Sequence, residues 1–338
     1  MLTVVIIFLA LAILLYFLLG GADFGAGIIE LFTSRRNKER TRATMYQAIG
    51  PIWEANHMWV IIAVVILFVG FPEIYSKMCT YLHIPILALL LGIIARGTAF
   101  TFRNYDAIKG ERTQALYNSI FVYSSFLTPL FLGIIAGSAI SRKIDFEATD
   151  FMTAYIYSWC NWFSIAVGLF TVALCGFLAA IYLVGEATEE NEVKRFIRKA
   201  KVLNAVAVFC GGLVFVAAET SGIPMAQWIF GNVVSLSAVM AASASLVLLW
   251  IVVAGGHRQL PRIFAAFQVS MILLSVGFTH FPNFLMEKNG HNLSLISTHA
   301  NMKTIETLGT ALLLGSLFIL PALGYLYYSF RGRQNEQH

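Results

Sequence analysis

Charged residues are scarce in this chain. Asp, Glu, Lys and Arg make up 12% of its 338 residues, against about 25% in a typical soluble domain. Hydrophobic residues make up 58%, and the mean hydropathy is +0.75. A soluble fold of this length cannot remove so much apolar surface from water. The composition therefore excludes an ordinary soluble enzyme and a disordered chain. It indicates an all-α integral membrane protein that crosses the bilayer several times.

Cysteines and nucleotide-binding motifs are also few. The four cysteines form no CxxC pair, which argues against a zinc site, a redox pair and a disulfide-stapled domain. We expect them to be small buried hydrophobic residues; they are Cys79, Cys160, Cys175 and Cys210. The sequence has no GxGxxG motif and no P-loop, so nucleotide binding is not predicted. The net charge of +5 does not indicate nucleic-acid binding, because basic residues of membrane proteins collect in cytoplasmic loops.

Nine stretches are long and apolar enough to cross a bilayer, which takes about 20 residues. The first, 2–32, has no basic n-region and no small-residue cleavage site, so we predict a transmembrane helix and not a signal peptide. The others are 48–70, 81–102, 116–140, 153–184, 202–220, 227–254, 262–281 and 305–330. The longest polar connections, 185–201 and 283–304, are too short for a second soluble domain.

The basic residues predict the orientation of the chain. Most of the 23 Lys and Arg residues follow every second span, in the segments 35–42, 103–112, 194–201, 258–262 and 331–333. By the positive-inside rule these segments lie in the cytoplasm. The N-terminus is then outside and the C-terminus is cytoplasmic, which agrees with an odd number of spans.

Three charged residues lie well inside the predicted spans, away from their ends: Asp23, Glu54 and Arg96. Such residues cost about 2.5–3.5 kcal/mol each on insertion scales, and they commonly mark proton or ion pathways. All three lie about two to three helical turns from the nearest basic loop, at ~1.5 Å per residue. We therefore expect them at similar depth in the cytoplasmic half of three successive helices. Two interpretations stay open: a buried ion cluster that only fixes packing, and a proton or cation route from the cytoplasm.

Other acidic residues lie near the ends of spans. Glu30, Glu73 and Glu219 are predicted to be solvated, because side chains at helix ends reach the interface. The glycines around Asp23, in the string Gly20-Gly21-Ala22-Asp23-Phe24-Gly25-Ala26-Gly27, are interpreted as packing residues that let helices approach closely.

The second span begins with a dense group of polar residues and tryptophans. In Gly50-Pro51-Ile52-Trp53-Glu54-Ala55-Asn56-His57-Met58-Trp59, Pro51 suits a first helical turn. His57 shares a helix face with Glu54 and Trp53, because these lie three and four residues before it. His57 also raises the possibility of haem, for which His83 and His280, near the outer ends of their spans, are further candidates. Two histidines ligate a haem only at matched depth on facing helices.

Three ordered strings resemble subunit II of the cytochrome bd quinol oxidases. Residues 21–27 have the D-x-G-x-G shape, residues 49–59 match G-P-x-W-[DE]-x-N-x-x-W, and residues 95–103 match R-x-x-x-F-x-x-R. Beyond the first hundred residues the resemblance rests on length, span count and topology. It implies one membrane domain of two four-helix bundles, at 1–140 and 153–281, plus a peripheral ninth helix at 305–330.

The resemblance also implies a working context. Subunit II pairs with a larger subunit I in the bacterial inner membrane, sometimes with a small single-helix accessory subunit. The complex oxidises quinol, reduces O2 to water and builds a proton gradient by taking protons from the cytoplasm. Two haem b groups and one haem d are expected in subunit I, and no cofactor is expected on this chain. A structural quinone or lipid in a groove of the chain is possible, and no nucleic-acid partner is implied.

Site residues carry over from the resemblance by position. They are Asp23 and Glu54 for the proton path, Arg96 in support and Trp59 beside an oxygen route. His57, on the same helix face as Glu54, is a further supporting candidate from its own position and not from the resemblance. Many relatives carry a second acid three residues before the one at Asp23, where this chain has Gly20. A water molecule or Glu54 would have to take over its role. Two alternatives stay open: a transporter with a midplane site of Asp23, Glu54 and Arg96, and a subunit that binds its own b-type haem.

Overall fold

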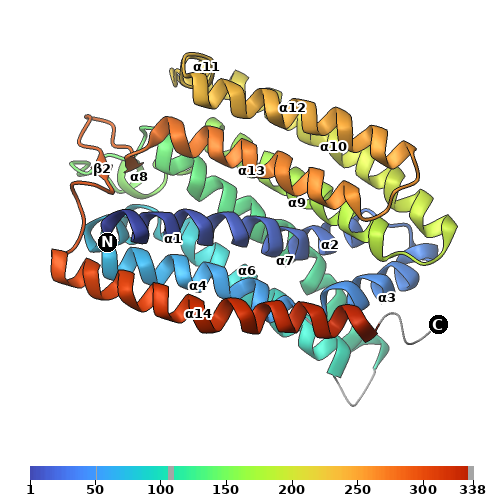
Figure 1. The fold of residues 1–338 in the computed structure, drawn as a ribbon. Helices are drawn as coiled ribbons and strands as arrows, with labels where there is room; N and C mark the ends of the chain where they lie inside the picture. The colour runs from blue at the N-terminus through green and yellow to red at the C-terminus, as the bar shows by residue number, and fades with distance from the viewer. Residues whose placement is uncertain (51, 106–109, 334–338) are drawn as a thin grey trace.

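The computed structural model describes residues 1–50, 52–105 and 110–333, and most of them are α-helical (Figure 1). Nine helical segments of the described chain are long and apolar enough to span a membrane. They are α1 Leu2–Leu15 with α2 Gly21–Leu31, α4 Trp53–Gly70, α6 His83–Tyr105, α7 Glu111–Ile140, α9 Trp162–Glu186, α10 Glu190–Thr220, α12 Val233–Ala254, α13 Leu260–His280 and α14 Met302–Arg333. The predicted all-α fold with nine spans is confirmed. Pro51 and Lys109 lie outside the described residues.

Short elements lie at both ends of the long helices. At one end, η2 Arg35–Asn37 leads into α3 Lys38–Ile49 (Figure 1). This end carries the basic loops, and we call it the basic end. At the other end lie α8 Phe151–Tyr155, α11 Met225–Phe230 and the hairpin of β1 Asn283–Leu285 with β2 Leu293–Ser294 (Figure 1). The helix α5 Pro72–Tyr81 connects α4 to α6.

Three span boundaries differ most from the prediction. The fifth span begins at Trp162 and not at 153, because the Asn161 side chain caps the helix by accepting a hydrogen bond from the Ser164 backbone N–H. The seventh begins at Val233, where Asn232 caps in the same way. The sixth begins at Glu190 and not at 202, so most of the predicted inner loop is helix. The polar residues before position 202 were excluded from the predicted sixth span, but a helix can extend beyond the membrane into water where its side chains are solvated.

The span α9 lies at the centre of the molecule and packs against α2, α7, α10 and α13. Phe177, Leu178 and Ile181 in its middle are fully buried. A Cβ atom at Gly25 of α2 would lie 1.9 Å from the Cys175 carbonyl oxygen of α9, so only glycine permits this approach. The interpretation of the helix-1 glycines as packing residues is supported here. The division into two bundles stays a prediction, because α9 packs on helices from both halves.

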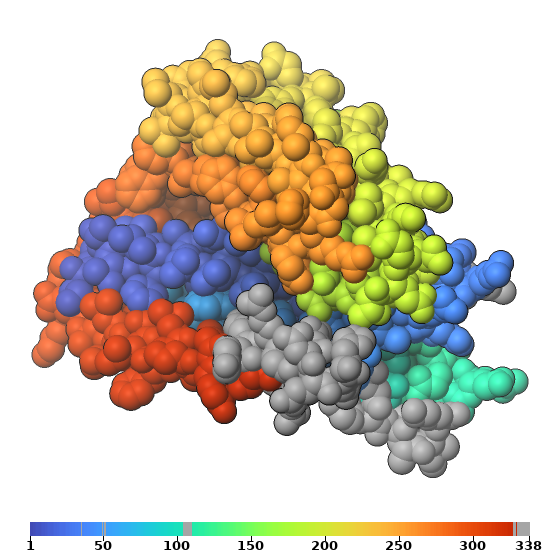
Figure 2. Space-filling model, turned by 45° about the vertical axis from the view of Figure 1, so that its right-hand side comes forward, coloured from blue at the N-terminus to red at the C-terminus, as the bar shows by residue number. Residues whose placement is uncertain are grey.

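Two edges of the molecule lie far apart. The helix α14 packs along α1 and α4 and is largely exposed. The pair α10 and α12 lies at the opposite edge, as Figures 1 and 2 show from two directions. Both edges carry exposed apolar side chains, as expected for surfaces that face lipid or another membrane subunit.

The cysteines and the outer acids can now be placed. Cys175 and Cys210 are buried, as predicted. The prediction is wrong for Cys160, which is exposed in the turn before α9, and for Cys79, which is half-buried in α5. Glu73 and Glu219 are exposed, as predicted.

Candidate functional site

Two buried polar layers lie between α2, α6 and their neighbours. Asp23 and Glu30 are seven residues apart on α2, and Arg96 and Arg103 are seven residues apart on α6. Both helices run toward the basic end, so each acid lies level with one arginine, and the two levels are separated by ~10 Å. We call Asp23, Asn56, His57, Arg96 and Ser125 the Asp23 layer. Glu30, Arg42 and Arg103, nearer the basic end, are the Glu30 layer.

The guanidinium of Arg96 organises the Asp23 layer and is 1% exposed. Its Nη2 donates to the backbone carbonyl of Asp23 at 2.7 Å, and its Nε donates to Ser125 Oγ at 3.2 Å. Its Nη1 lies 3.4 Å from His57 Nε2.

Two aromatic rings complete the surroundings of Arg96. The rings of Phe24 and Phe121 each lie 5.2 Å from its guanidinium carbon. Neutral dipoles and ring faces therefore take the place of water around this cation.

The carboxyl group of Asp23 is held differently. It is buried, and its Oδ2 accepts a hydrogen bond from Asn56 Nδ2 at 2.9 Å. None of the ion pairs among the described residues includes Asp23. The predicted proximity of Asp23 and Arg96 is confirmed, but Arg96 binds the backbone of Asp23 and not its carboxyl group. A carboxyl group outside an ion pair can exchange a proton without breaking one.

Glu54 does not join this layer. Its side chain is exposed on α4, while Asn56 and Trp59 of the same helix are buried. Glu54 shares its exposed stripe with Ile61 and Phe68, at intervals of seven residues. The rotation of α4 about its own axis, relative to the neighbouring helices, places this stripe on the outside of the chain. The functional role of Glu54 stays a prediction.

Two polar atoms, one in the Asp23 layer and one beside it, are buried without a hydrogen-bond partner among the described residues. The hydroxyl of Tyr16 and Nδ1 of His57 have no hydrogen bond in the described part of the chain. Their rings lie 6.0 Å apart. Tyr16 begins η1 Tyr16–Gly20, a π-helical turn in the first span. Such turns often occur at functional sites. Tyr16 was missed from the sequence, although a phenol inside an apolar span needs a polar partner.

The Glu30 layer is a closed ion cluster. Glu30 is 0% exposed, and its two carboxylate oxygens accept hydrogen bonds from Arg42 Nε at 2.6 Å and Arg103 Nη1 at 3.0 Å. The prediction of a solvated Glu30 is wrong, because α3 folds back over the end of α2 and brings Arg42 to it. The guanidinium carbon of Arg103 lies 4.4 Å from the Phe121 ring, which also contacts Arg96. Phe121 therefore joins the two layers.

The end of α2 receives one more cation that the sequence did not reveal. Lys199 of α10 donates to the Ile29 carbonyl at 3.0 Å and to the Thr33 hydroxyl. These bonds satisfy groups at the C-terminal end of the helix, where cations are favourable. The basic end of the site is thus held by α3, α6 and α10 together.

The three histidines considered as haem ligands, His57, His83 and His280, do not fit a haem held between facing helices. The His83 ring lies 5.2 Å from Tyr155, and the His280 ring lies 4.6 Å from Trp228. The two histidines therefore have different neighbours and do not face each other. His57 lies inside a span, but its Nε2 faces the Arg96 cation. The described residues also contain no group of three or more His, Cys, Asp or Glu side chains placed to hold a metal ion.

Comparison with known proteins decides the family. Residues 1–330 match the family described as Cytochrome bd terminal oxidase subunit II. The chain belongs to this family. It is therefore a subunit of a membrane-bound terminal oxidase, which is an oxidoreductase. This membership confirms the resemblance seen in the three sequence strings, and it leaves the transporter alternative without support.

Individual relatives agree with the family. The chain is 29% identical over 161 residues to cytochrome bd ubiquinol oxidase subunit 2 of Bacillus subtilis, a match that covers 47% of this chain and 46% of that protein. It is 23% identical over 305 residues to cytochrome bd-I ubiquinol oxidase subunit 2 of Escherichia coli K12, covering 81% and 79%. A chain of the bd oxidase structure from Geobacillus thermodenitrificans has the same fold, with a TM-score of 0.76, 19% identity and coverage of 97% and 98%.

Proposed function

We propose that this chain is the haem-free second subunit of a complex that oxidises quinol and reduces O2 to water in the bacterial inner membrane. The family match and the ubiquinol oxidase names of two relatives support the reaction. The family resemblance implies two haem b groups and one haem d in subunit I, and His83 and His280 form no facing pair of haem ligands on this chain. Those haems supply the electron transfer to O2. This chain contributes support, proton access and partner binding.

The Asp23 layer is the part of this chain suited to proton transfer. Reduction of one O2 consumes four protons, and taking them from the cytoplasm separates charge across the membrane without pumping. The carrying observation is the Asp23 carboxyl group, which is buried beside Arg96 yet bonded only to a neutral amide within the described residues. Tyr16 and His57 offer further buried polar atoms next to it.

Gly20 stands where many relatives carry a second acid. A Cβ atom at this position would lie 3.0 Å from the Tyr16 ring, so the ring covers the space beside Gly20. In this chain the Tyr16 phenol therefore takes the place beside Asp23 in the first span where a second acid is expected from the resemblance. A hydroxyl both donates and accepts hydrogen bonds, so it can pass a proton along a chain of such bonds.

Glu54 marks the face that meets subunit I. A charged carboxylate on a lipid-facing stripe costs about 2.5–3.5 kcal/mol at the centre of a span, and less in the first turn of α4, where Glu54 lies. Glu54 nevertheless lies on an exposed stripe of α4 with Ile61 and Phe68. A partner with polar groups at this depth removes that cost. We therefore assign this stripe of α4 to the contact with subunit I, where Glu54 would pass protons between the subunits.

Trp59 is 7% exposed and packs into the apolar cluster of α1 and α4. This environment suits a core residue and an apolar route for O2 equally. A role beside an oxygen route stays a prediction, tested by the dependence of turnover on O2 concentration in a Trp59→Phe complex.

Oxygen consumption by the intact complex tests the proton role. The variants are Asp23→Asn and Glu54→Gln, which keep the shape of each side chain. The control is Glu189→Gln, whose exposed side chain pairs with Arg40 at the basic end. We expect lower turnover per haem in both site variants and no change in the control. Wild-type turnover in both site variants would refute the proposal.

A further inference from the structure

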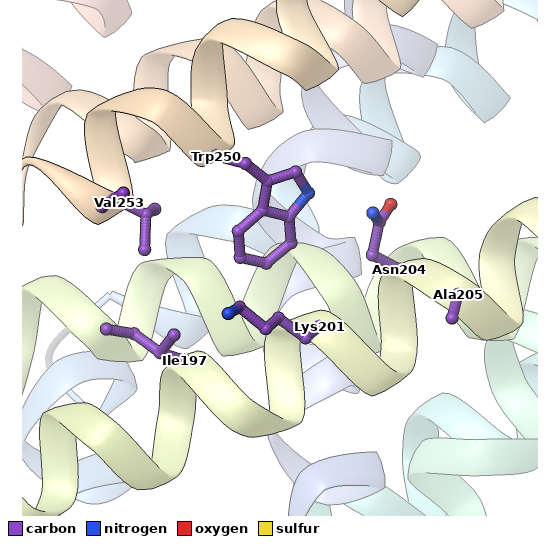
Figure 3. Close-up of a pocket in the computed structure, with 7 residues that line it drawn as sticks. Ile197, Lys201, Asn204, Ala205, Trp250 and Val253 are labelled. Atoms are coloured by element: carbon purple, nitrogen blue, oxygen red, sulfur yellow. The ribbon is translucent and has the colours of Figure 1, made fainter.

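A groove lies on the outer edge of the molecule, between α10 and α12, near the basic end. Its volume is about 480 Å³. Figure 3 shows that one helix contributes Ile197, Lys201, Asn204 and Ala205, and that Trp250 and Val253 face them from the other. The Lys201 ammonium and the indole of Trp250 share the groove, with the ammonium 5.9 Å from the ring.

The cation in this groove has no anionic partner among the described residues. The nearby acids of α10 bind other cations. Glu190 pairs with Lys194 at 3.8 Å and with Arg258 at 3.3 Å. Glu192 pairs with Arg195 at 2.9 Å. Lys201 therefore presents an unneutralised positive charge to whatever occupies the groove.

The sequence places this charge at the membrane interface. Lys201 is the last basic residue of α10 before the apolar stretch 202–218. Trp250 lies about one turn before the end of α12 at Ala254. Tryptophan is enriched where the acyl region meets the headgroups, and a lysine stem extends toward the headgroup phosphates. Toward the middle of the helices the groove continues along an apolar wall of Ala205 and the Trp250 indole, whereas Ile197 and Val253 line it toward the basic end.

The groove also lies away from the face assigned to subunit I. Figures 1 and 2 place α10 and α12 at the edge opposite α14, which packs against α4. The side of the molecule that carries Lys201 therefore faces away from α4 and α14.

We propose that this groove binds one anionic phospholipid of the leaflet at the basic end. The phosphate pairs with the Lys201 ammonium, and the Asn204 amide offers a hydrogen-bond donor beside it. An acyl chain lies along Trp250 and the apolar wall. Basic pockets between transmembrane helices on this side are known binding places for anionic headgroups. A quinone fits less well, because its uncharged head leaves Lys201 unneutralised. The proposal is independent of the proton role of Asp23.

Native mass spectrometry of the purified complex tests this proposal. The probes are phosphatidylglycerol and phosphatidylcholine with the same acyl chains. We expect the wild-type complex to retain phosphatidylglycerol in preference to phosphatidylcholine. Lys201→Gln should weaken phosphatidylglycerol binding roughly fivefold, the effect of one basic residue near the membrane surface. Ala205→Trp, which fills the groove and keeps the charge, should lower binding of both lipids.

Arg36→Gln is the matched control, because Arg36 is exposed at the basic end but belongs to η2, away from the groove. It should leave lipid binding unchanged, and thermal unfolding checks that every variant complex is folded. Three results would overturn the proposal. The first is equal phosphatidylglycerol binding by Lys201→Gln and wild type. The second is equal binding of the two lipids by wild type. The third is a quinone that is recovered with the wild-type complex and lost from the Ala205→Trp complex, because a quinone would then be the occupant of the groove.

Discussion

The two layers between α2 and α6 have the same arrangement of residues, but their carboxyl groups are bonded differently. Each has a buried acid on α2, an arginine on α6 and a contact with Phe121. In the Glu30 layer two guanidiniums bind the carboxylate, so its charge is fixed by its neighbours. In the Asp23 layer the arginine binds a backbone carbonyl, and the carboxyl group meets a neutral amide. The difference favours a structural role for the Glu30 layer and supports the proton role proposed for the Asp23 layer.

The largest expected effect comes from opening the Glu30 layer. Glu30→Gln leaves Arg42 and Arg103 without their shared carboxylate, and breaking a buried ion pair costs about 3–5 kcal/mol. We expect a clear fall in the thermal unfolding midpoint of the purified complex. Glu189→Gln removes an exposed acid at the same end and should leave the midpoint unchanged. Equal unfolding midpoints for the two variants would show that the Glu30 layer does not stabilise the folded complex.

The next effect tests the contact of α2 with α9, which positions both layers. Gly25→Ala places a Cβ atom 1.9 Å from the Cys175 carbonyl oxygen, so the helices must separate. Overpacking of this kind costs about 1–3 kcal/mol. Gly212→Ala on α10 is the matched control, because no atom lies within 4 Å of its Cβ position. A Gly25→Ala complex as stable as the control would contradict the close helix contact.

A third prediction separates the two arginines. Among the described residues, Arg96 bonds the Asp23 carbonyl and Ser125 and faces His57, whereas Arg103 makes one hydrogen bond, to Glu30. A lysine can form one ion pair but lacks the planar fork. Arg96→Lys should therefore destabilise the complex by about 1–3 kcal/mol, and Arg103→Lys by less. The unfolding midpoints of the two variants check this order, and the reverse order would contradict it.

The smallest expected effect lies at the outer end, where an exposed pair provides a reference for the buried ones. Lys288 Nζ lies 3.1 Å from Asp145, and this bond holds the pKa of Asp145 below its usual range. A lowered carboxyl pKa stabilises the fold above the pKa of the unfolded state, and that contribution disappears as pH falls through the lowered value. Lys288→Ala should lower the unfolding midpoint slightly at neutral pH and not at all in strong acid. A difference that persists in acid would exclude this pair as its source.

The sequence predicted the nine spans and, within the site, the proximity of Asp23 and Arg96. Scarce charge made Asp23 and Arg96 visible, because each interrupts an apolar stretch, and the structure brings them together. Span ends were less accurate, since the caps at Asn161 and Asn232 set the helix starts inside the predicted ranges. Polarity alone does not show whether a residue ends a helix or begins one.

The remaining site depended on packing that a single sequence does not encode locally. Glu30 is buried only because α3 folds back with Arg42, and Glu54 is exposed only because of the rotation of α4 against its neighbours. Lys199 reaches the end of α2 from a helix far along the chain. Each of these depends on a tertiary contact.

Proton uptake during a single turnover tests the central claim most directly. The complex is reconstituted in lipid vesicles, and proton uptake from the side of the basic end is followed for wild type and for Asp23→Asn. Asn56 can still donate to the new amide oxygen at position 23, so Asp23→Asn should unfold at nearly the wild-type temperature. It should nevertheless take up protons at least about tenfold more slowly, as expected when a proton-transferring group is removed. Wild-type uptake by Asp23→Asn would contradict the account.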